Sequence, residues 1–436
     1  MPTRLAVRTV DTTGDGFANL PEEPTHRPRD LTVRIDRCGS GFRVLLFGRA
    51  VETTPYGTHE AVLEKSQAQV EQLADDMRRV WFERFIGYES APDRFPYSDG
   101  VNLTDVEVDE GELARAIGAL HAVGYKCLMG LLEGAAPSMV RLRGQLVDVL
   151  RKDGLLIRFE SRDVYFPWPM LCLPPRPEEP PVDGGRPPFD RFLGYRHQIE
   201  QTSCLEPPPG PPPGPSPVTP VPEASDRVRA SLHTDGLDDL LSAPTAAAEV
   251  ARLLSDVTRL TVRSSSEDLF ADMVSPEFAD ELMYFWCHGQ FGSPGPDGTP
   301  PAMTIKLTDE HLIDAQDIGS RMTLAREGGP FASAPFVFLN ACHLGQLSSG
   351  QVHHIGMALL RHGATGVLGP QAPVPVAFAA EYALRFLKTY LDGARAGDVM
   401  QELTRAFADT YSNPLGLLYS LHSGLDSKLT RPERAL

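Results

Sequence analysis

Two short apolar runs of this chain end on side chains that can do chemistry. MYFWCHG at residues 283–289 ends on His288, and FVFLNACHLG at residues 336–345 contains Cys342. A short apolar run bounded by turn residues is typical of a parallel strand buried on both faces. Sites in open parallel sheets form outside the carboxyl ends of the strands, so the sequence predicts an imidazole beside a thiol at one edge.

An imidazole beside a thiol is suited to acyl transfer. A free thiol has a pKa near ~8.5 and is a poor nucleophile at neutral pH, whereas an imidazole that takes or balances its proton supplies thiolate. His288 would play this part for Cys342. The backbone amides of Gly289 and Cys342, which follow the two strand ends, could point at the oxyanion that develops on a substrate carbonyl.

Other interpretations of the same residues stay open. A buried cysteine is usually a small hydrophobe, and a lone histidine is usually a satisfied polar group. The two Cys-His pairs, with a His-His pair at residues 353–354, also suit zinc, although adjacent strand residues point to opposite faces. GATGVLG at residues 363–369 resembles a phosphate loop, but no Lys-Ser/Thr follows, which favours a strand entered by a tight turn.

Composition narrows the class of protein. The chain has 436 residues, 42% of them hydrophobic and 23% charged, which is enough for substantial cores. Its formal charge of −17 argues against a nucleic-acid partner, because binding to phosphate backbones needs a basic surface. No apolar leader or run of ~18 apolar residues is visible, so we expect no membrane partner. The 6 scattered cysteines indicate free thiols and a cytoplasmic protein.

Four regions are expected along the chain. Residues 1–30 are a polar, flexible lead-in, 31–205 an α+β region, 206–223 a proline-rich linker of polyproline type, and 224–436 the region that carries the chemistry. In the α+β region the patterns predict a hairpin over 31–36 and 42–48, a helix over 58–85, two helices within 110–151 broken near Gly134, a strand over 154–160 and an edge strand over 164–173.

Beyond the linker, strands and helices alternate. The predicted strands are 228–233, 260–263, 282–288, 336–342 and 366–368, and the predicted helices are 246–254, 267–273, 355–361 and 375–391. Such βαβ spacing is typical of a parallel sheet with right-handed crossovers. The fold class expected for this region is therefore α/β.

Several of these blocks together resemble the CHAT domain, a bacterial branch of the caspase-like clan that includes separase. MYFWCHG resembles its histidine strand, FVFLNACHLG its cysteine strand, LLRHGATGVLG the helix and strand that follow, and NPLGLLYSLHSGLD a closing segment. LLIRFESRDVYFPWPMLC and RFLGYRHQI resemble the half that precedes the catalytic subdomain. The resemblance implies a caspase-hemoglobinase-like, mostly parallel sheet flanked by helices and preceded by an α+β half, with the linker inserted between two halves of one CHAT unit.

The resemblance also implies a function. It would make the chain a cysteine endopeptidase without a cofactor or metal, with Cys342 as nucleophile, His288 as general acid/base and the Gly289 amide in the oxyanion hole. Its substrate would be a protein, and it would stay inactive until an activating protein partner binds its first half, as an effector in a bacterial signalling or conflict system. The alternative is a CHAT-fold interaction module without turnover. A nucleotide-binding domain would need a phosphate loop that the sequence lacks.

The chain departs from relatives that cleave after Arg or Lys. The resemblance implies that in those relatives an acidic residue two positions before the cysteine helps to bind the basic P1 side chain. This chain has Asn340 at that position, and a neutral amide supplies no charge. The stretch after the fifth strand is GPQAPVPVAFAAE, which contributes Gln371 and Glu381. Asn340, Gln371 and Glu381 are therefore the candidate substrate-binding residues, and we expect no preference for a basic side chain at P1 unless Glu381 or another acid supplies the charge.

Overall fold

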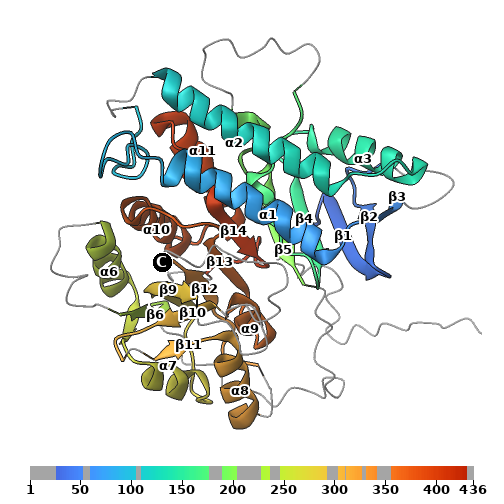
Figure 1. Ribbon diagram of the computed structural model, residues 1–436. Helices are drawn as coiled ribbons and strands as arrows, with labels where there is room; N and C mark the ends of the chain where they lie inside the picture. Colours follow the sequence, from blue (N-terminus) through green and yellow to red (C-terminus); the bar gives the residue numbers. More distant parts are fainter. Residues whose placement is uncertain are drawn as a thin grey trace, which may run out of the picture.

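Strands from both halves of the chain form one large sheet (Figure 1). The structure is a computed structural model that describes residues 26–52, 59–104, 110–175, 189–203, 227–235, 246–291, 303–309, 311–326, 330–340 and 355–429. Within these ranges the strands of the large sheet are β1 (Leu31–Cys38), β2 (Gly41–Phe47), β3 (His59–Leu63), β4 (Leu156–Ser161), β5 (Gln198–Thr202), β6 (Arg229–Thr234), β7 (Arg259–Arg263), β8 (Leu282–Trp286), β12 (Phe336–Leu339), β13 (Gly366–Pro370) and β14 (Tyr419–His422). Their order across the sheet is β3-β2-β1-β4-β5-β14-β13-β12-β8-β6-β7.

The two halves meet where β5 pairs with β14. This pair is parallel, with Leu421 opposite Glu200 and His422 opposite Gln201. Most other neighbours are also parallel, and the described exceptions are β1–β2, β2–β3 and β13–β14. The first half therefore extends the sheet of the second half along β14, and the expected α/β class with a mostly parallel sheet is confirmed.

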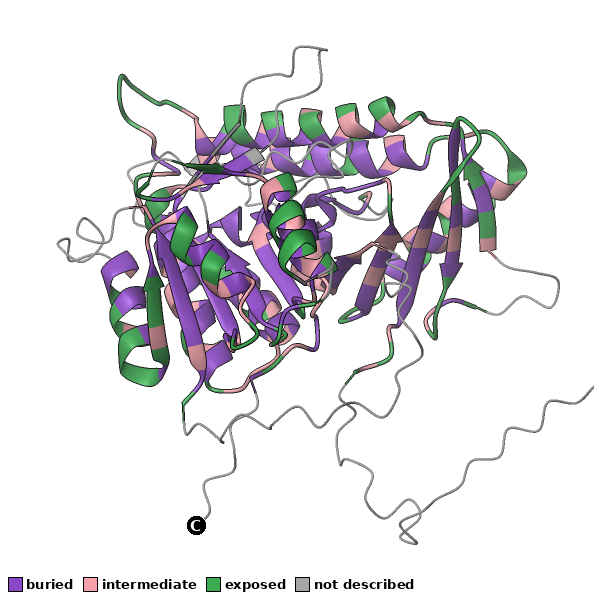
Figure 2. Cartoon of the chain, turned by 90° about the horizontal axis from the view of Figure 1, so that it is seen from below, coloured by how far each residue is buried: buried purple, intermediate pink, exposed green. Residues whose placement is uncertain are grey.

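Helices flank the sheet and divide its side chains between two cores. The helices of the described residues are α1 (Gln67–Trp81), α2 (Glu110–Leu131), α3 (Pro137–Leu150), α4 (Leu193–Arg196), α6 (Ala246–Val257), α7 (Ser266–Met273), α8 (Ala315–Arg326), α9 (Ile355–Arg361), α10 (Val376–Leu391) and α11 (Ala396–Tyr411), with the π-helix η1 (Phe82–Ile86) and the short 3₁₀-helices η2 (Trp168–Met170), η3 (Phe189–Arg191) and η4 (Pro414–Leu418). Phe336 and Phe338 of β12 pack into the larger core with α10, whereas Val337 and Leu339 pack into the second core with α7, α8 and α9. Figure 2 shows the central strands largely buried and the helices exposed on their outer faces.

A small antiparallel sheet begins one residue after β8. It consists of β9 (His288–Phe291), β10 (Met303–Lys306) and β11 (Leu312–Ile313), in the order β11-β10-β9. Ile305 and Ile313 are fully buried in the second core and anchor this sheet. The predicted strand over 282–288 is therefore two strands, because the chain leaves the large sheet at Cys287.

Charged side chains form a ladder along the strands of the first half. The ion pairs are Arg34–Glu160 at 2.6 Å, Arg158–Glu200 at 2.8 Å, Arg29–Glu200 at 2.8 Å, Arg29–Asp426 at 2.7 Å and Arg27–Asp426 at 2.6 Å. Two of them join residues that are direct cross-strand neighbours, which is where opposite charges stabilise a sheet. Arg27 and Arg29 fall in the expected flexible lead-in, so its last residues are in fact anchored to the far end of the chain. Residues 1–25 and 204–226, which include the whole of the proline-rich linker, lie outside the described ranges, and the domain boundaries stay predictions.

Most expected elements of both halves are present. The hairpin is confirmed: Cys38 pairs with Gly41 across a two-residue turn, where Gly39 has a φ of 62° that suits glycine. The two helices around Gly134 are α2 and α3, and the alternating strands and helices of the second half lie within a few residues of their predicted positions. GATGVLG is a tight turn into β13, with Gly363 at a φ of 100°.

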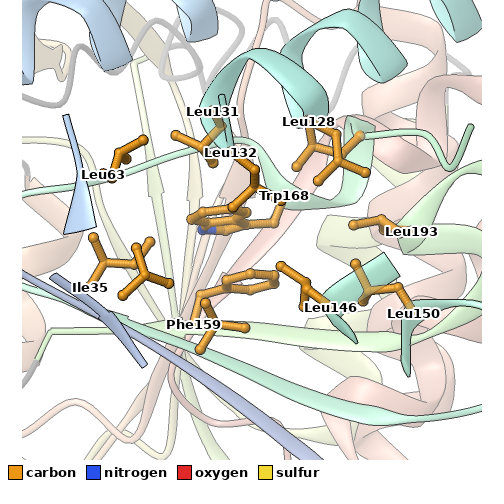
Figure 3. A pocket seen from close by; sticks show the side chains of 13 residues that line it. Ile35, Leu63, Leu128, Leu131, Leu132, Leu146, Leu150, Phe159, Trp168 and Leu193 are labelled. Carbon is orange, nitrogen blue, oxygen red and sulfur yellow. The ribbon is translucent and has the colours of Figure 1, made fainter. Parts of the chain in front are cut away.

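Two predictions for the first half are wrong. The helix predicted over 58–85 is β3 followed by α1, because Ser66 and Gln69 form a capping box that starts the helix at Gln67. The segment 164–173 is not an edge strand. Its aromatic and proline residues form a buried corner in which Trp168 stacks on Phe159 at 3.7 Å, beside an apolar void of about 10 Å³ (Figure 3). That volume is about one water, so the void is a packing gap and not a ligand site.

Candidate active site

The candidate site lies at the carboxyl ends of β8 and β12. These strands are parallel neighbours with Leu339 opposite Phe285, and the amide of Asn340 donates to the Phe285 carbonyl at 2.9 Å. The two strand ends are therefore level, as the sequence predicts. Cys342 follows β12 by three residues and lies outside the described residues, so its assignment as nucleophile stays a prediction.

His288 is the first residue of the small sheet. Its backbone pairs with Lys306, and Gly289 pairs with Ile305. Gly289 is buried and Cys287 is 6% exposed in the second core, so the chain around His288 is fixed by packing as well as by strand pairing. The side chain of His288 is outside the described set, and neither its role nor that of the Gly289 amide is tested.

Asn340 is held inside the core. It is 2% exposed, and its Nδ2 donates to the Ala379 carbonyl at 2.9 Å and to the Tyr284 hydroxyl at 3.3 Å. Its Oδ1 accepts from the Tyr419 hydroxyl at 2.8 Å. Both amide donors are thus used by the protein itself, and the contacts tie the end of β12 to β8, α10 and β14. This geometry favours a positioning role, and substrate binding by Asn340 stays a prediction.

Gln371 follows β13 and belongs to the same edge. It is 3% exposed, its backbone amide donates to the Leu418 carbonyl at 2.7 Å, and its Nε2 lies 3.3 Å from Nε2 of His422. Burial lowers the pKa of His422 to about 4, so its ring is neutral at pH 7 and can accept from the Gln371 amide. Gln371 and Asn340 meet through adjacent residues, Leu418 and Tyr419, and form one buried network.

Arg78 brings a cation from the first half to this network. Its Nε donates to the Gln371 carbonyl at 3.0 Å, and its Nη1 pairs with Asp75 at 2.8 Å. Burial lowers the pKa of the guanidinium to about 10, although Asp75 opposes the shift. Arg78 stays charged at neutral pH. Within the described residues its buried Nη2 has no hydrogen-bond partner.

Sequence reasoning missed Arg78, although a signal was present. The buried stripe of α1 includes Ala74, Met77 and Trp81, and Arg78 stands on the same face, four residues after Ala74. A lone arginine within an apolar helical stripe indicates either a buried partner or a polar site.

Glu381 is engaged on the flank of α10. Its Oε1 accepts from Nε of Arg385 at 2.6 Å, and Arg385 also lies over the rings of Phe407 and Tyr411. In the described contacts Glu381 shares no partner with Asn340 or Gln371. Its assignment as a substitute acid for a basic P1 residue stays a prediction.

The described residues contain no group of three His, Cys, Asp or Glu side chains that could hold a metal ion. The histidines at 353–354 and Cys342 lie outside those residues, so the zinc alternative is not tested. None of the described helices has both the length and the hydropathy of a membrane span.

The comparison with protein families identifies the chain. The CHAT domain family matches residues 165–414, more than half of the chain, so the protein belongs to the CHAT domain family. The match begins before residues 206–223 and continues beyond them, which agrees with one sheet shared by both halves.

Individual relatives match only in part. A protein from Vitiosangium sp. (strain GDMCC 1.1324) described as a probable protease is 31% identical over 140 residues, which are 32% of this chain and 17% of that protein. Two crystal structures of the Saccharomyces cerevisiae separase–securin complex cover 90% of this chain and 30% of theirs, with TM-scores of 0.40 and 0.37 and identities of 12% and 10%. The chain thus spans less than a third of the length of each of these relatives.

Proposed function

We propose that this CHAT protein is a cysteine endopeptidase with Cys342 as nucleophile and His288 as general acid/base. The observation that carries the proposal is the parallel pairing of β8 with β12, with level carboxyl ends. Membership of the CHAT family and the partial match to a protein described as a probable protease support the reaction class.

In the proposed reaction His288 takes the proton of the Cys342 thiol, and the thiolate attacks the scissile carbonyl carbon. The tetrahedral oxyanion is held by the amides of Gly289 and Cys342. The imidazolium then gives its proton to the leaving amine as the C–N bond breaks, which leaves a thioester on Cys342. Water, deprotonated by His288, attacks the thioester and releases the carboxylic acid and the thiol.

The network around Asn340 bears on specificity. Asn340 carries no charge and is bonded to three groups of the core, while the cation that reaches this edge is Arg78. We therefore propose that the substrate is a protein cleaved without a requirement for a basic P1 side chain. A buried cation beside this edge disfavours a basic side chain more than a neutral or acidic one.

Activation by a protein partner is part of the proposal. Because the first half shares the sheet and supplies Arg78, a partner that shifts α1 would act on the loop after β13 directly. In a bacterial signalling or conflict system in the cytoplasm, such gating would restrain the protease until its signal arrives. If the purified chain alone hydrolyses added substrate at its full rate, partner gating is wrong.

The experiment is labelling with iodoacetamide from pH 5 to 9, read site by site by mass spectrometry, together with hydrolysis of a peptide library with and without cell lysate. Wild type is compared with Cys342→Ala, His288→Ala and the control Cys287→Ala, which removes a buried thiol next to His288. We expect Cys342 to react at a pH below the pKa of ~8.5 of a free thiol, and we expect this pH profile to shift upward in His288→Ala. Hydrolysis should be lost in Cys342→Ala and retained in Cys287→Ala. Ordinary thiol reactivity at Cys342 with no hydrolysis under any condition would instead identify a CHAT-fold interaction module.

A further inference from the structure

A polar cavity of about 380 Å³ lies among the end of α3, the short helix α4 and the middle of α11. Four arginines line it, Arg151, Arg191, Arg196 and Arg405, together with Tyr195. Its lining includes none of the candidate active-site residues. The volume lies within the range of small-molecule sites, unlike the apolar void in the first half.

Backbone carbonyls hold three of these arginines in place. Arg151 donates to the Pro174 carbonyl at 3.3 Å, Arg191 donates to the Leu173 carbonyl at 3.1 Å, and Arg405 donates through Nε to the Tyr195 carbonyl at 2.9 Å. A carbonyl orients a guanidinium but does not neutralise its charge. The remaining N–H groups of each fork are therefore preoriented and still fully charged.

Both carboxylates of the cavity lining form ion pairs with the same arginine. Arg196 pairs with Asp153 at 2.5 Å and with Asp190 at 3.7 Å, and these are the two carboxylates in the lining. In the described part of the chain, Arg151, Arg191 and Arg405 form no ion pair. Four arginines against two aspartates give the lining a net charge of +2, on a chain whose formal charge is −17.

Another observation is a buried donor on Arg196, one of the lining residues. The Nε of Arg196 is buried and has no hydrogen-bond partner among the described residues, although its two Nη atoms donate to the carbonyls of Asp190 and Arg151. All four arginines of the lining are half-buried, so solvent still reaches them. An anion in the cavity would pair with the three cations that lack a carboxylate and could accept a hydrogen bond from the orphaned donor.

We propose that this cavity binds a multiply charged phosphate-bearing small molecule of about the size of a pyrophosphate or a mononucleotide. Arginine forks match phosphate oxygens in pairs, and a ligand with several negative charges can engage the three arginines that lack a carboxylate. The ligand would bridge the last turn of α3 to α11. The proposal concerns binding alone and does not depend on peptidase activity.

Isothermal titration calorimetry of the full chain with inorganic pyrophosphate, ATP and adenosine tests the proposal. Pyrophosphate and ATP are expected to bind at one site and to raise the melting temperature, and adenosine is expected not to bind. The affinity should fall steeply between 50 and 300 mM salt, because the contacts are charge pairs. Affinity for ATP above that for pyrophosphate would assign the site to a nucleotide, and equal affinities would assign it to the phosphate groups alone.

Matched variants locate the site. Arg151→Gln and Arg191→Gln keep a donor for the backbone carbonyl and remove the charge, and each should weaken pyrophosphate binding about tenfold or more, with a larger loss in the double variant. Arg79→Gln, which removes an exposed arginine of α1, is the control and should bind like wild type. The proposal is overturned if pyrophosphate and ATP do not bind, if the control loses as much affinity as the cavity variants, or if an acidic peptide binds there and phosphates do not compete.

Discussion

Replacing Asn340 by alanine should destabilise the protein by about 3 kcal/mol. The side chain makes three hydrogen bonds to buried partners, Ala379, Tyr284 and Tyr419, and each such bond contributes about 1 kcal/mol net. Because the residue is 2% exposed, water does not replace these bonds without rearrangement. The loss would fall on the contacts that hold the end of β12 against β8, α10 and β14.

A double-mutant cycle measures one of these bonds directly. Tyr419→Phe removes the hydroxyl that donates to Asn340 at 2.8 Å and keeps the ring stacked on Tyr382 at 3.8 Å. We expect about 1 kcal/mol for Tyr419→Phe alone and a coupling of about 1 kcal/mol with Asn340→Ala. The assay is urea unfolding at pH 7, followed by circular dichroism and tryptophan fluorescence with a common m-value.

Asn340→Asp separates a positioning role from substrate binding. The new carboxylate can still accept from Tyr419, but its second oxygen would replace the donor that now meets the Ala379 carbonyl at 2.9 Å. Two acceptors would then face each other in a buried site, so we expect a loss of about 2–3 kcal/mol at pH 7 that shrinks as the carboxyl protonates at lower pH. No cleavage after Arg or Lys should appear. An Asn340→Asp protein that is as stable as wild type and gains cleavage after basic residues would refute this reasoning and assign Asn340 to the substrate.

Three further predictions concern the framework. Asp426→Asn should lower the free energy of unfolding by about 3 kcal/mol at pH 7, because the carboxylate is buried between Arg27 and Arg29. Despite opposing burial, these arginines lower the pKa of Asp426, so the difference from wild type in urea unfolding should shrink as pH falls below 4. An unchanged difference would contradict this prediction. Burial lowers the pKa of His121 to about 4, so the folded state loses stability as pH falls from 6.5 to 4. His121→Leu should reduce the slope of the unfolding free energy against pH by about one proton, or about 1.4 kcal/mol per pH unit. A slope equal to that of wild type would refute the assignment. Cutting the chain at a specific protease site inserted within residues 206–223 should leave both pieces together in size-exclusion chromatography, because β5 and β14 pair across the cut, and separation of the pieces without denaturant would contradict a shared sheet.

The fold of the second half could be predicted because its signals are local. Runs such as LMYFW and FVFL are buried on both faces, and glycine turns punctuate them, so the order of elements follows from the chain. The first half is harder to predict from the sequence. The segment 59–63 alternates in burial like a strand, but it precedes a helix of similar apolar content, and only the capping box at Ser66 marks the boundary.

The position of the candidate site could be predicted from the sequence, but the residues that hold it in place could not. The edge where β8 and β12 end follows from parallel pairing, and the structure has the two strands side by side. The small sheet that holds His288 depends on pairing with residues 303–306. These segments are too short for their hydrophobic periodicity to predict that pairing. Arg78 reaches the same edge from a helix more than two hundred residues earlier in the chain, and such a contact appears only when the fold is known.

The N-terminal half shares the large sheet with the second half and contacts the edge that carries the candidate site. Without it, β14 would be a free edge beside β13, since its partner on that side is β5. The same half supplies the guanidinium that binds the Gln371 carbonyl, and Gln371 is fixed in turn by Leu418 at the start of β14. A displacement of α1 or β5 would therefore alter the loop after β13 through hydrogen bonds that are present in the structure. A partner that binds the first half would have a direct mechanical route to the carboxyl edge of the sheet, and it would need no contact with that edge itself.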